Sequence, residues 1–233
     1  ANNVGVGDRA GKTLTTGTQN TFVGGASGFN ASTSDDNTGI GYGALFATTT
    51  GANNTSVGSN SLLGNTTGHS NVAVGATALT ANTTGTSNVA IGRQCLDANT
   101  EGGSNVAVGR GALGSNTTAS NNTAVGTDSL TANTTGVYNV ALGGYALDAN
   151  TTASYNTALG YQASSTNTTG NSNVSVGYNS AILNTEGSQN VSVGYQSLYS
   201  NTTANNNTAV GTNSLFANTT GTQNTAVGAN ALD

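Results

Sequence analysis

The sequence predicts an all-β fold: a parallel β-solenoid, or β-roll, of fourteen 17-residue coils. The first observation is a motif, Asn-x-x-(Val/Ile/Leu)-Gly, whose asparagine recurs every 17 residues from Asn3 to Asn224 without insertion or deletion. The second is composition: 6% of residues are charged, 5% are aromatic, and Pro, Met and Trp are absent. The third is that every copy carries glycine among β-branched residues and Asn, which are weak helix formers. We therefore expect each residue of the period to have a fixed place in a stacked coil.

We number the period from the motif asparagine and call the residues at one position in successive coils a column. Position 4 is Val, Ile or Leu in every copy, and position 2 is Val or Thr, usually with a small residue between them. This alternation predicts a short strand at positions 2 to 4, with position 4 and part of position 2 in the core. The residues of column 4 that we assign to this core ladder are Val74, Ile91 and Val108.

The glycine at position 5 is invariant, which predicts a bend with positive φ or a close chain approach directly after the strand. The ladder glycines assigned here are Gly75, Gly92, Gly109 and Gly126. Position 9 is Leu in ten of the fourteen copies, which predicts a second short strand at positions 7 to 10 with this leucine inward. The inward leucines assigned are Leu79, Leu96 and Leu113. The rest, Asn-Thr-Thr-(Gly/Ala)-x-x, is rich in turn formers and closes the coil.

Stacking in register places like residues above one another, so a repeated charge would form a repulsive column. A repeated asparagine forms instead a ladder in which each amide donates and accepts. We assign this role to the opening asparagines, among them Asn71, Asn88, Asn105, Asn122 and Asn139. We assign it also to the asparagines at position 12, among them Asn82, Asn99 and Asn116.

The core that one coil supplies is thin, because it holds little more than one aliphatic residue and one leucine. Burial of those side chains alone does not offset the entropy of ordering the coil, so hydrogen bonds between stacked coils must contribute. The columns of small residues at positions 3 and 8 predict a surface on which a second or third copy packs closely. We therefore expect self-association, with a homotrimer favoured and an end-to-end filament as the alternative.

The first three coils depart from the period, which predicts two regions. The departures are Gly11 and Gly28 at position 9, and Leu14, Ala31 and Thr48 at position 12. Terminal repeats of solenoids are commonly atypical because they cap an edge or join another element. Residues 1–53 are therefore expected to be a cap or junction, and residues 54–233 a regular solenoid continuous with it.

Enzyme and cofactor chemistry have little support in the sequence. A single histidine, His69, a single cysteine, Cys95, and acids scattered among the coils leave no converged catalytic or metal-binding set. We expect no enzymatic activity and no cofactor. Four basic residues and a net charge of −5 speak against nucleic acid as a partner. No apolar run approaches the roughly 18 residues of a membrane span, so no membrane insertion is expected.

Three repeated features have alternative interpretations. Tyr161, Tyr178 and Tyr195 occupy position 6 of three successive coils, either as a surface ladder or as a stripe that stacks on a host-surface glycan. The eight position-12 asparagines in Asn-Thr-Thr sequons are either turn and ladder residues or glycosylation acceptors. Columns of threonine on a flat solenoid also admit ice binding, which needs alternating threonines on one strand face.

The strings NVAVGATAL, NVAIGRQCL and NTAVGTDSL resemble repeats of trimeric autotransporter adhesin heads, which are left-handed parallel β-rolls assembled as trimers. The longer unit NVSVGYQSLYSNTTANNN resembles repeats in tail-fibre proteins of tailed bacteriophages. The resemblance covers the whole chain. Adhesin head repeats are usually shorter than 17 residues, however, and nothing here resembles a coiled-coil stalk, a membrane anchor or a C-terminal chaperone domain.

The resemblance implies a structural function: a rigid, repetitive shaft of a phage tail fibre or bacterial surface adhesin that supports attachment. It implies an extracellular location, on a virion or a cell surface. A subunit of an end-to-end extracellular filament is the alternative structural function. An ice- or glycan-binding solenoid is the alternative of another class.

Overall fold

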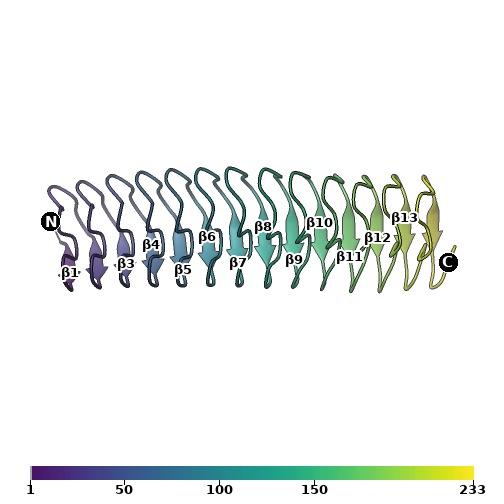
Figure 1. The fold of residues 1–233 in the computed structure, drawn as a ribbon, viewed down its shortest axis with the longest axis horizontal. Coiled ribbons are helices and arrows are strands. Elements are labelled where there is room, and N and C mark those ends of the chain that lie inside the picture. Colours follow the sequence, from purple (N-terminus) through teal and green to yellow (C-terminus); the bar gives the residue numbers. More distant parts are fainter. Residues whose placement is uncertain (1) are drawn as a thin grey trace. The chain divides into compact units, whose positions relative to one another are not determined.

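The computed structural model describes residues 2–233 and shows the predicted all-β, parallel β-solenoid (Figure 1). The chain divides into two compact units, Ala1–Ala119 with β1 to β7 and Ser120–Asp233 with β8 to β14. Each coil contributes one strand, always at positions 2 to 4. The strands are β1 (Val4–Val6), β2 (Thr21–Val23), β3 (Thr38–Ile40), β4 (Thr55–Val57), β5 (Val72–Val74), β6 (Val89–Ile91), β7 (Val106–Val108), β8 (Thr123–Val125), β9 (Val140–Leu142), β10 (Thr157–Leu159), β11 (Val174–Val176), β12 (Val191–Val193), β13 (Thr208–Val210) and β14 (Thr225–Val227).

Within each unit, successive strands pair in parallel with a register of one period. Val72 of β5 lies beside Val89 of β6, and Val74 lies beside Ile91. The backbone N–H of Val72 donates to the carbonyl of Asn88 in the next coil at 2.8 Å, and that of Gly75 donates to Val57 in the preceding coil at 2.8 Å. A strand that returns after 17 residues therefore finds both hydrogen-bonding neighbours in adjacent copies of itself.

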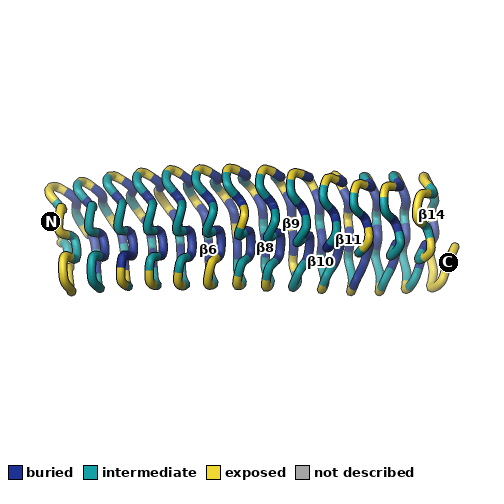
Figure 2. Tube along the Cα trace, viewed as in Figure 1, coloured by how far each residue is buried: buried dark blue, intermediate teal, exposed yellow. Residues whose placement is uncertain are grey.

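The strands face the opposite way from the prediction. The middle residue of every strand after β1 is buried, and Ala73, Ala90 and Ala107 are fully so. The flanking residues of columns 2 and 4 point outward, and Ile91 is 40% exposed. Figure 2 shows the alternation along the strands. Placing Val74, Ile91 and Val108 in the core was wrong, and they belong to an outward strand face.

The reason is the width of the interior, where positions 3 and 8 touch. The hydroxyl of Ser56, at position 3, donates to the carbonyl of Ser61, at position 8, at 2.9 Å. The thiol of Cys95, at position 8, lies 3.1 Å from the carbonyl oxygen of Ala107, at position 3. Only small side chains fit between two backbones at this distance. The small-residue columns thus pack against each other, and the expectation that they form a surface for another copy was wrong.

The second predicted strand, at positions 7 to 10, does not form. Positions 7 and 9 adopt left-handed backbone conformations, with φ of 56° at Thr77 and 51° at Leu79. This segment is a turn, although it still bonds to neighbouring coils: Thr77 N–H donates to Ser59 and Leu79 N–H to Cys95, each at 2.9 Å. The position-9 leucines do point inward, and Leu79, Leu96 and Leu113 are fully buried.

Glycine at position 5 has both features predicted from the sequence, a positive φ and a close approach to the neighbouring coil. At Gly75 φ is 134°, a region that L side chains rarely adopt. A Cβ atom there would lie 2.6 Å from the carbonyl oxygen of Gly92 in the next coil. The other ladder glycines have the same conformation, namely Gly92, Gly109 and Gly126. The column therefore allows the close stacking of the corners.

The first three coils keep the regular strand register, and their glycines at position 9 have a packing cause. Gly11 and Gly28 lack the leucine side chain of position 9, and the ring of Phe22 from β2 occupies that space. A Cβ atom on Gly39, at position 3 of the next coil, would lie 3.1 Å from the same ring. One large residue at position 3 therefore replaces the missing volume of its neighbours.

Candidate functional site

The opening asparagines form one continuous column within each unit. The side-chain Oδ1 of Asn54 accepts from the backbone N–H of Asn71 at 3.0 Å and from its Nδ2 at 3.2 Å. The Nδ2 of Asn71 also donates to the carbonyl of Gly85 in its own coil at 2.9 Å. Each amide thus ties two coils together and closes its own coil. The predicted members Asn71, Asn88, Asn105, Asn122 and Asn139 are all fully buried.

The position-12 asparagines form a second, parallel column. The Nδ2 of Asn82 donates to Oδ1 of Asn65 at 2.9 Å and to the carbonyl of Gly85 at 3.0 Å. The carbonyl at position 15 therefore accepts from both columns. Asn99 and Asn116 repeat the arrangement, with Asn99 Nδ2 donating to Asn82 Oδ1 at 2.9 Å. The column begins only at Asn65, because Leu14, Ala31 and Thr48 precede it.

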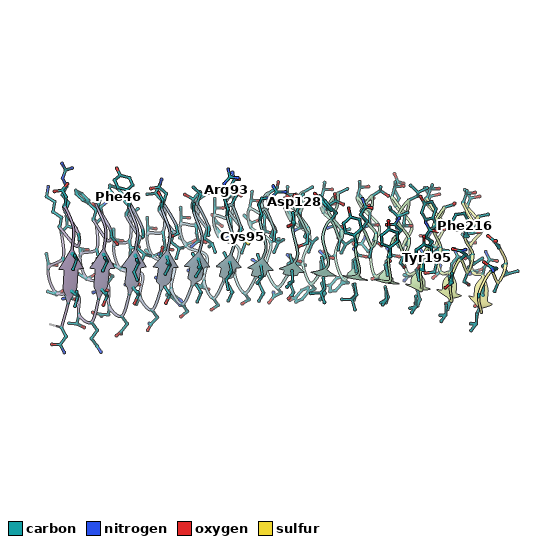
Figure 3. The ribbon with its side chains drawn as sticks, turned by 90° about the horizontal axis from the view of Figure 1, so that it is seen from below. Phe46, Arg93, Cys95, Asp128, Tyr195 and Phe216 are labelled. Carbon is teal, nitrogen blue, oxygen red and sulfur yellow. The ribbon has the colours of Figure 1, made fainter. Side chains whose placement is uncertain are left out.

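The strand face of each unit carries no charge. All thirteen charged residues of the chain occupy other positions of the period, and columns 2 and 4 contain only Val, Thr, Ile and Leu. In Figure 3 Arg93 and Phe46 project from the side away from the strands. Threonine shares column 2 with valine but never occupies column 4, so the alternating threonines that ice binding needs are missing from this face.

The tyrosine stripe is a stack of rings in the second unit. The ring centroids of Tyr161 and Tyr178 are 5.8 Å apart and those of Tyr178 and Tyr195 are 5.5 Å apart, with interplanar angles of 13° and 7°. Each ring therefore covers the face of its neighbour and presents its edge and hydroxyl to solvent. Stacking on a sugar needs an open ring face, so the geometry favours a ladder between coils.

A shallow apolar groove lies on the first unit, on the side that bears the position-10 residues. Its walls are the side chains of Tyr42, Phe46 and Leu63, and Gly43 leaves it open by lacking a side chain. The rings of Phe46 and Phe29 stack at 5.1 Å beside it. Asn60 provides the polar side chain in the lining, which is too little to define a ligand class.

The titratable residues do not converge. No group of three His, Cys, Asp or Glu residues that could hold a metal ion occurs among residues 2–233. Burial raises the pKa of the Cys95 thiol to about 12, so the thiol stays protonated and unreactive at neutral pH. Burial also raises the pKa of Asp97 and of Asp148, both at position 10. His69 is exposed, outside the strands.

The sequon asparagines of position 12 are enclosed by the fold. Seven of the eight are fully buried, and the amide nitrogen of each donates to the position-15 carbonyl of its own coil: Asn65, Asn82, Asn116, Asn133, Asn150, Asn167 and Asn201. Asn218, in the last of these coils, is half-buried and donates to Asn201 Oδ1 at 3.1 Å. Their geometry is that of ladder residues.

Comparison with known proteins identifies no relative: no protein-family model, no curated protein and no solved structure matches the chain. In the described part of the chain, no helix has the length and apolar character needed to cross a membrane. Column 4 was predicted to lie in the core, and it lies instead on the outward strand face. Two features of the sequence indicated this orientation: Val and Thr alternate freely in column 2, and column 3 holds mostly small residues.

Proposed function

We propose that the chain is a structural repeat module that assembles side by side with copies of itself into a fibre or filament, through the outward strand face. The observation that carries the proposal is the contrast between this face and the rest of the surface. Columns 2 and 4 hold only aliphatic residues and threonine, while all thirteen charges lie elsewhere. A shaft of a phage tail fibre or of a bacterial surface adhesin, outside the cell, is the setting that fits such a module.

The chemistry of the face favours a second copy as the occupant. A flat, uncharged sheet face offers no charge pattern that would select a polar partner. Two such faces can pack about 10 Å apart with their side chains interdigitated, as in β-sandwiches. Every copy carries the same face, so the contact can be self-complementary.

The area of the strand face indicates that the strength of association increases with the number of coils in contact. Seven strands spaced about 4.8 Å apart, each three residues of about 3.3 Å, give one unit a flat strand face on the order of 300 Å². A stable interface buries about 800 Å² on each partner. One unit alone therefore associates weakly, and contacts along many coils add up to a stable assembly, as a fibre requires.

A single charge on the face tests this proposal. Val74→Lys puts a charge in column 4, whereas Ala76→Lys adds the same charge two residues away at an exposed position where the next coil carries Arg93. We expect wild type and Ala76→Lys to form assemblies in sedimentation equilibrium and by electron microscopy, and Val74→Lys to shift toward single chains. Circular dichroism should show all three equally folded.

Two results would contradict the proposal. One is a wild-type chain that remains single over the whole concentration range. The other is Val74→Lys assembling to the same extent as Ala76→Lys. The end-to-end alternative would leave both variants equally assembled, because neither substitution touches the open edges of the stack.

A further inference from the structure

In three coils an Asn-Asn-Thr sequon begins at position 17, whose side chain belongs to neither asparagine column. We propose that Asn53, Asn121 and Asn206 are acceptors for N-linked transfer of a hexose from a nucleotide-activated sugar. Each opens an Asn-Asn-Thr sequon, and each is exposed in the folded chain. This inference concerns the single chain, because the threonine of each sequon lies on the strand face that self-assembly would cover.

The fold separates these three sequons from the others in the chain. Ten further sequon asparagines are buried: Asn54, Asn65, Asn82, Asn116, Asn133, Asn150, Asn167, Asn173, Asn190 and Asn201. Two more sequon asparagines, Asn30 and Asn218, are half-buried, and one side chain of each motif donates a hydrogen bond within the fold. Asn218 Nδ2 donates to Gly221 at 3.0 Å, and Ser32, the hydroxyl residue that follows Asn30, donates to Thr49 at 3.2 Å.

A sequon-specific transferase must contact the side-chain amide of the asparagine and the hydroxyl two residues later, and the corner presents both groups. The backbone is fixed, because Asn53 N–H donates to Asp35 and Asn206 N–H to Ser188, each at 3.1 Å. The side chain, by contrast, extends from an exposed corner. Two residues later the chain enters position 2, which faces outward. The hydroxyl residues Thr55, Thr123 and Thr208 therefore lie on the outside of the same coil, neither fully buried nor fully exposed.

The backbone at position 17 does not itself require asparagine. Its φ is 59° at Asn53, 62° at Asn121 and 60° at Asn206, in the left-handed region. Other coils adopt the same conformation with other residues: Gln19, Asp36, Ser70, Ser87, Ser104, Tyr138, Tyr155, Ser172, Gln189 and Gln223. All three asparagines are nevertheless followed by Thr at position 2, where seven of the fourteen coils have Val. Three of the four asparagines at position 17 therefore open a sequon, and Asn2, which is followed by Asn3 and Val4, does not.

The transfer is a substitution at the anomeric carbon of the sugar. The acceptor Nδ2 forms a bond to C1 of the hexose, and the bond from C1 to the diphosphate oxygen breaks. The nucleoside diphosphate leaves with that electron pair, and the amide proton passes to a base of the transferase. In the second unit Asn121 and Asn206 are five coils apart, about 24 Å, so the two sugars do not crowd each other.

The test uses the folded full-length chain at a dilution where sedimentation shows single chains, a soluble N-glycosyltransferase with sequon specificity, and UDP-glucose. We expect intact mass and peptide mapping to find up to three hexoses, on Asn53, Asn121 and Asn206. The triple variant Thr55→Val, Thr123→Val and Thr208→Val should accept none, and valine is already native at this position in coils such as that of Val72. Tyr155→Asn creates a new exposed Asn-Asn-Thr sequon ending at Thr157 and should add a fourth hexose.

Three outcomes would overturn the inference. The first is a hexose on Asn82 or another buried asparagine while circular dichroism shows the chain folded. The second is a folded chain that accepts nothing, although the urea-unfolded chain is modified at the three sites. The third is a Tyr155→Asn variant that gains no hexose at the new corner.

Discussion

Two parts of the coil interior are equally buried, yet they are stabilised by different interactions. The amide part contains the asparagine columns of positions 1 and 12, whose nitrogens meet at the carbonyl of position 15. The apolar part contains Ala or Ser at positions 3 and 8 and Leu at position 9. Burial of apolar groups is non-directional and tolerates small shifts, whereas the amide bonds exist only in one register. The apolar part therefore favours compaction, and the amide part selects the 17-residue register.

The largest expected effect is at the amide part. Asn71→Ala removes the Oδ1 that accepts from the backbone N–H of Asn88 at 2.9 Å, and the Nδ2 that donates to Gly85 at 2.9 Å. The Asn88 N–H stays buried without a partner and the Gly85 carbonyl keeps only its bond from Asn82, and together the two losses cost about 4 kcal/mol. Urea unfolding followed by circular dichroism measures the loss. Ser87→Ala, at an exposed corner nearby, serves as the control, and a loss below about 1 kcal/mol for Asn71→Ala would contradict the directional role.

A smaller loss is expected at the apolar part. Leu79→Ala leaves a cavity at a fully buried site and should cost about 3 kcal/mol. Leu183→Ala is the matched control, because Leu183 is 41% exposed. The same urea titration compares the two variants. Equal losses for Leu79 and Leu183 would show that the position-9 column does not form the core.

The thiol of Cys95 allows the apolar part to be probed by pH. Burial raises the pKa of this thiol from 9.0 to about 12. The folded chain thus holds the proton more tightly than the unfolded chain, so this contribution to stability is full below pH 9 and is lost as the pH rises toward 12. Wild type should lose stability over this range more steeply than Cys95→Ala, which carries the alanine common in this column. Parallel curves for the two proteins would be evidence against a buried thiol.

The smallest effect is expected outside the interior. Tyr178→Ala removes two stacked ring contacts in the second unit and should cost about 1 kcal/mol. Thermal unfolding monitored by circular dichroism can resolve the difference. Tyr42→Ala is the control, because Tyr42 is 68% exposed and has no tyrosine above or below it in its column. A loss as large as that of Leu79→Ala would mean that the outer stack, and not the interior, holds neighbouring coils together.

The period predicted the strand positions, the glycine corner and both amide columns, because each depends on stacking like residues in register. It did not predict which strand face lies inside. Alternation of Val74 with Ala73 is the same for either orientation, and the larger side chain was assigned to the core. The interior is instead so narrow that Ser56 touches Ser61 across it, and this width is a tertiary property. The left-handed backbone at Leu79 was likewise missed, since leucine is rarely found in that conformation.

The invariant glycine corner makes the length of this molecule adjustable only in whole steps. Removing one residue would move a side chain onto the corner, where a Cβ atom at Gly75 would already lie 2.6 Å from the carbonyl oxygen of Gly92. Removing a complete period, such as residues 72–88, would bring every column back into line. Within a unit, duplication or deletion of whole coils can therefore change the length of the stack in steps of about 4.8 Å per coil.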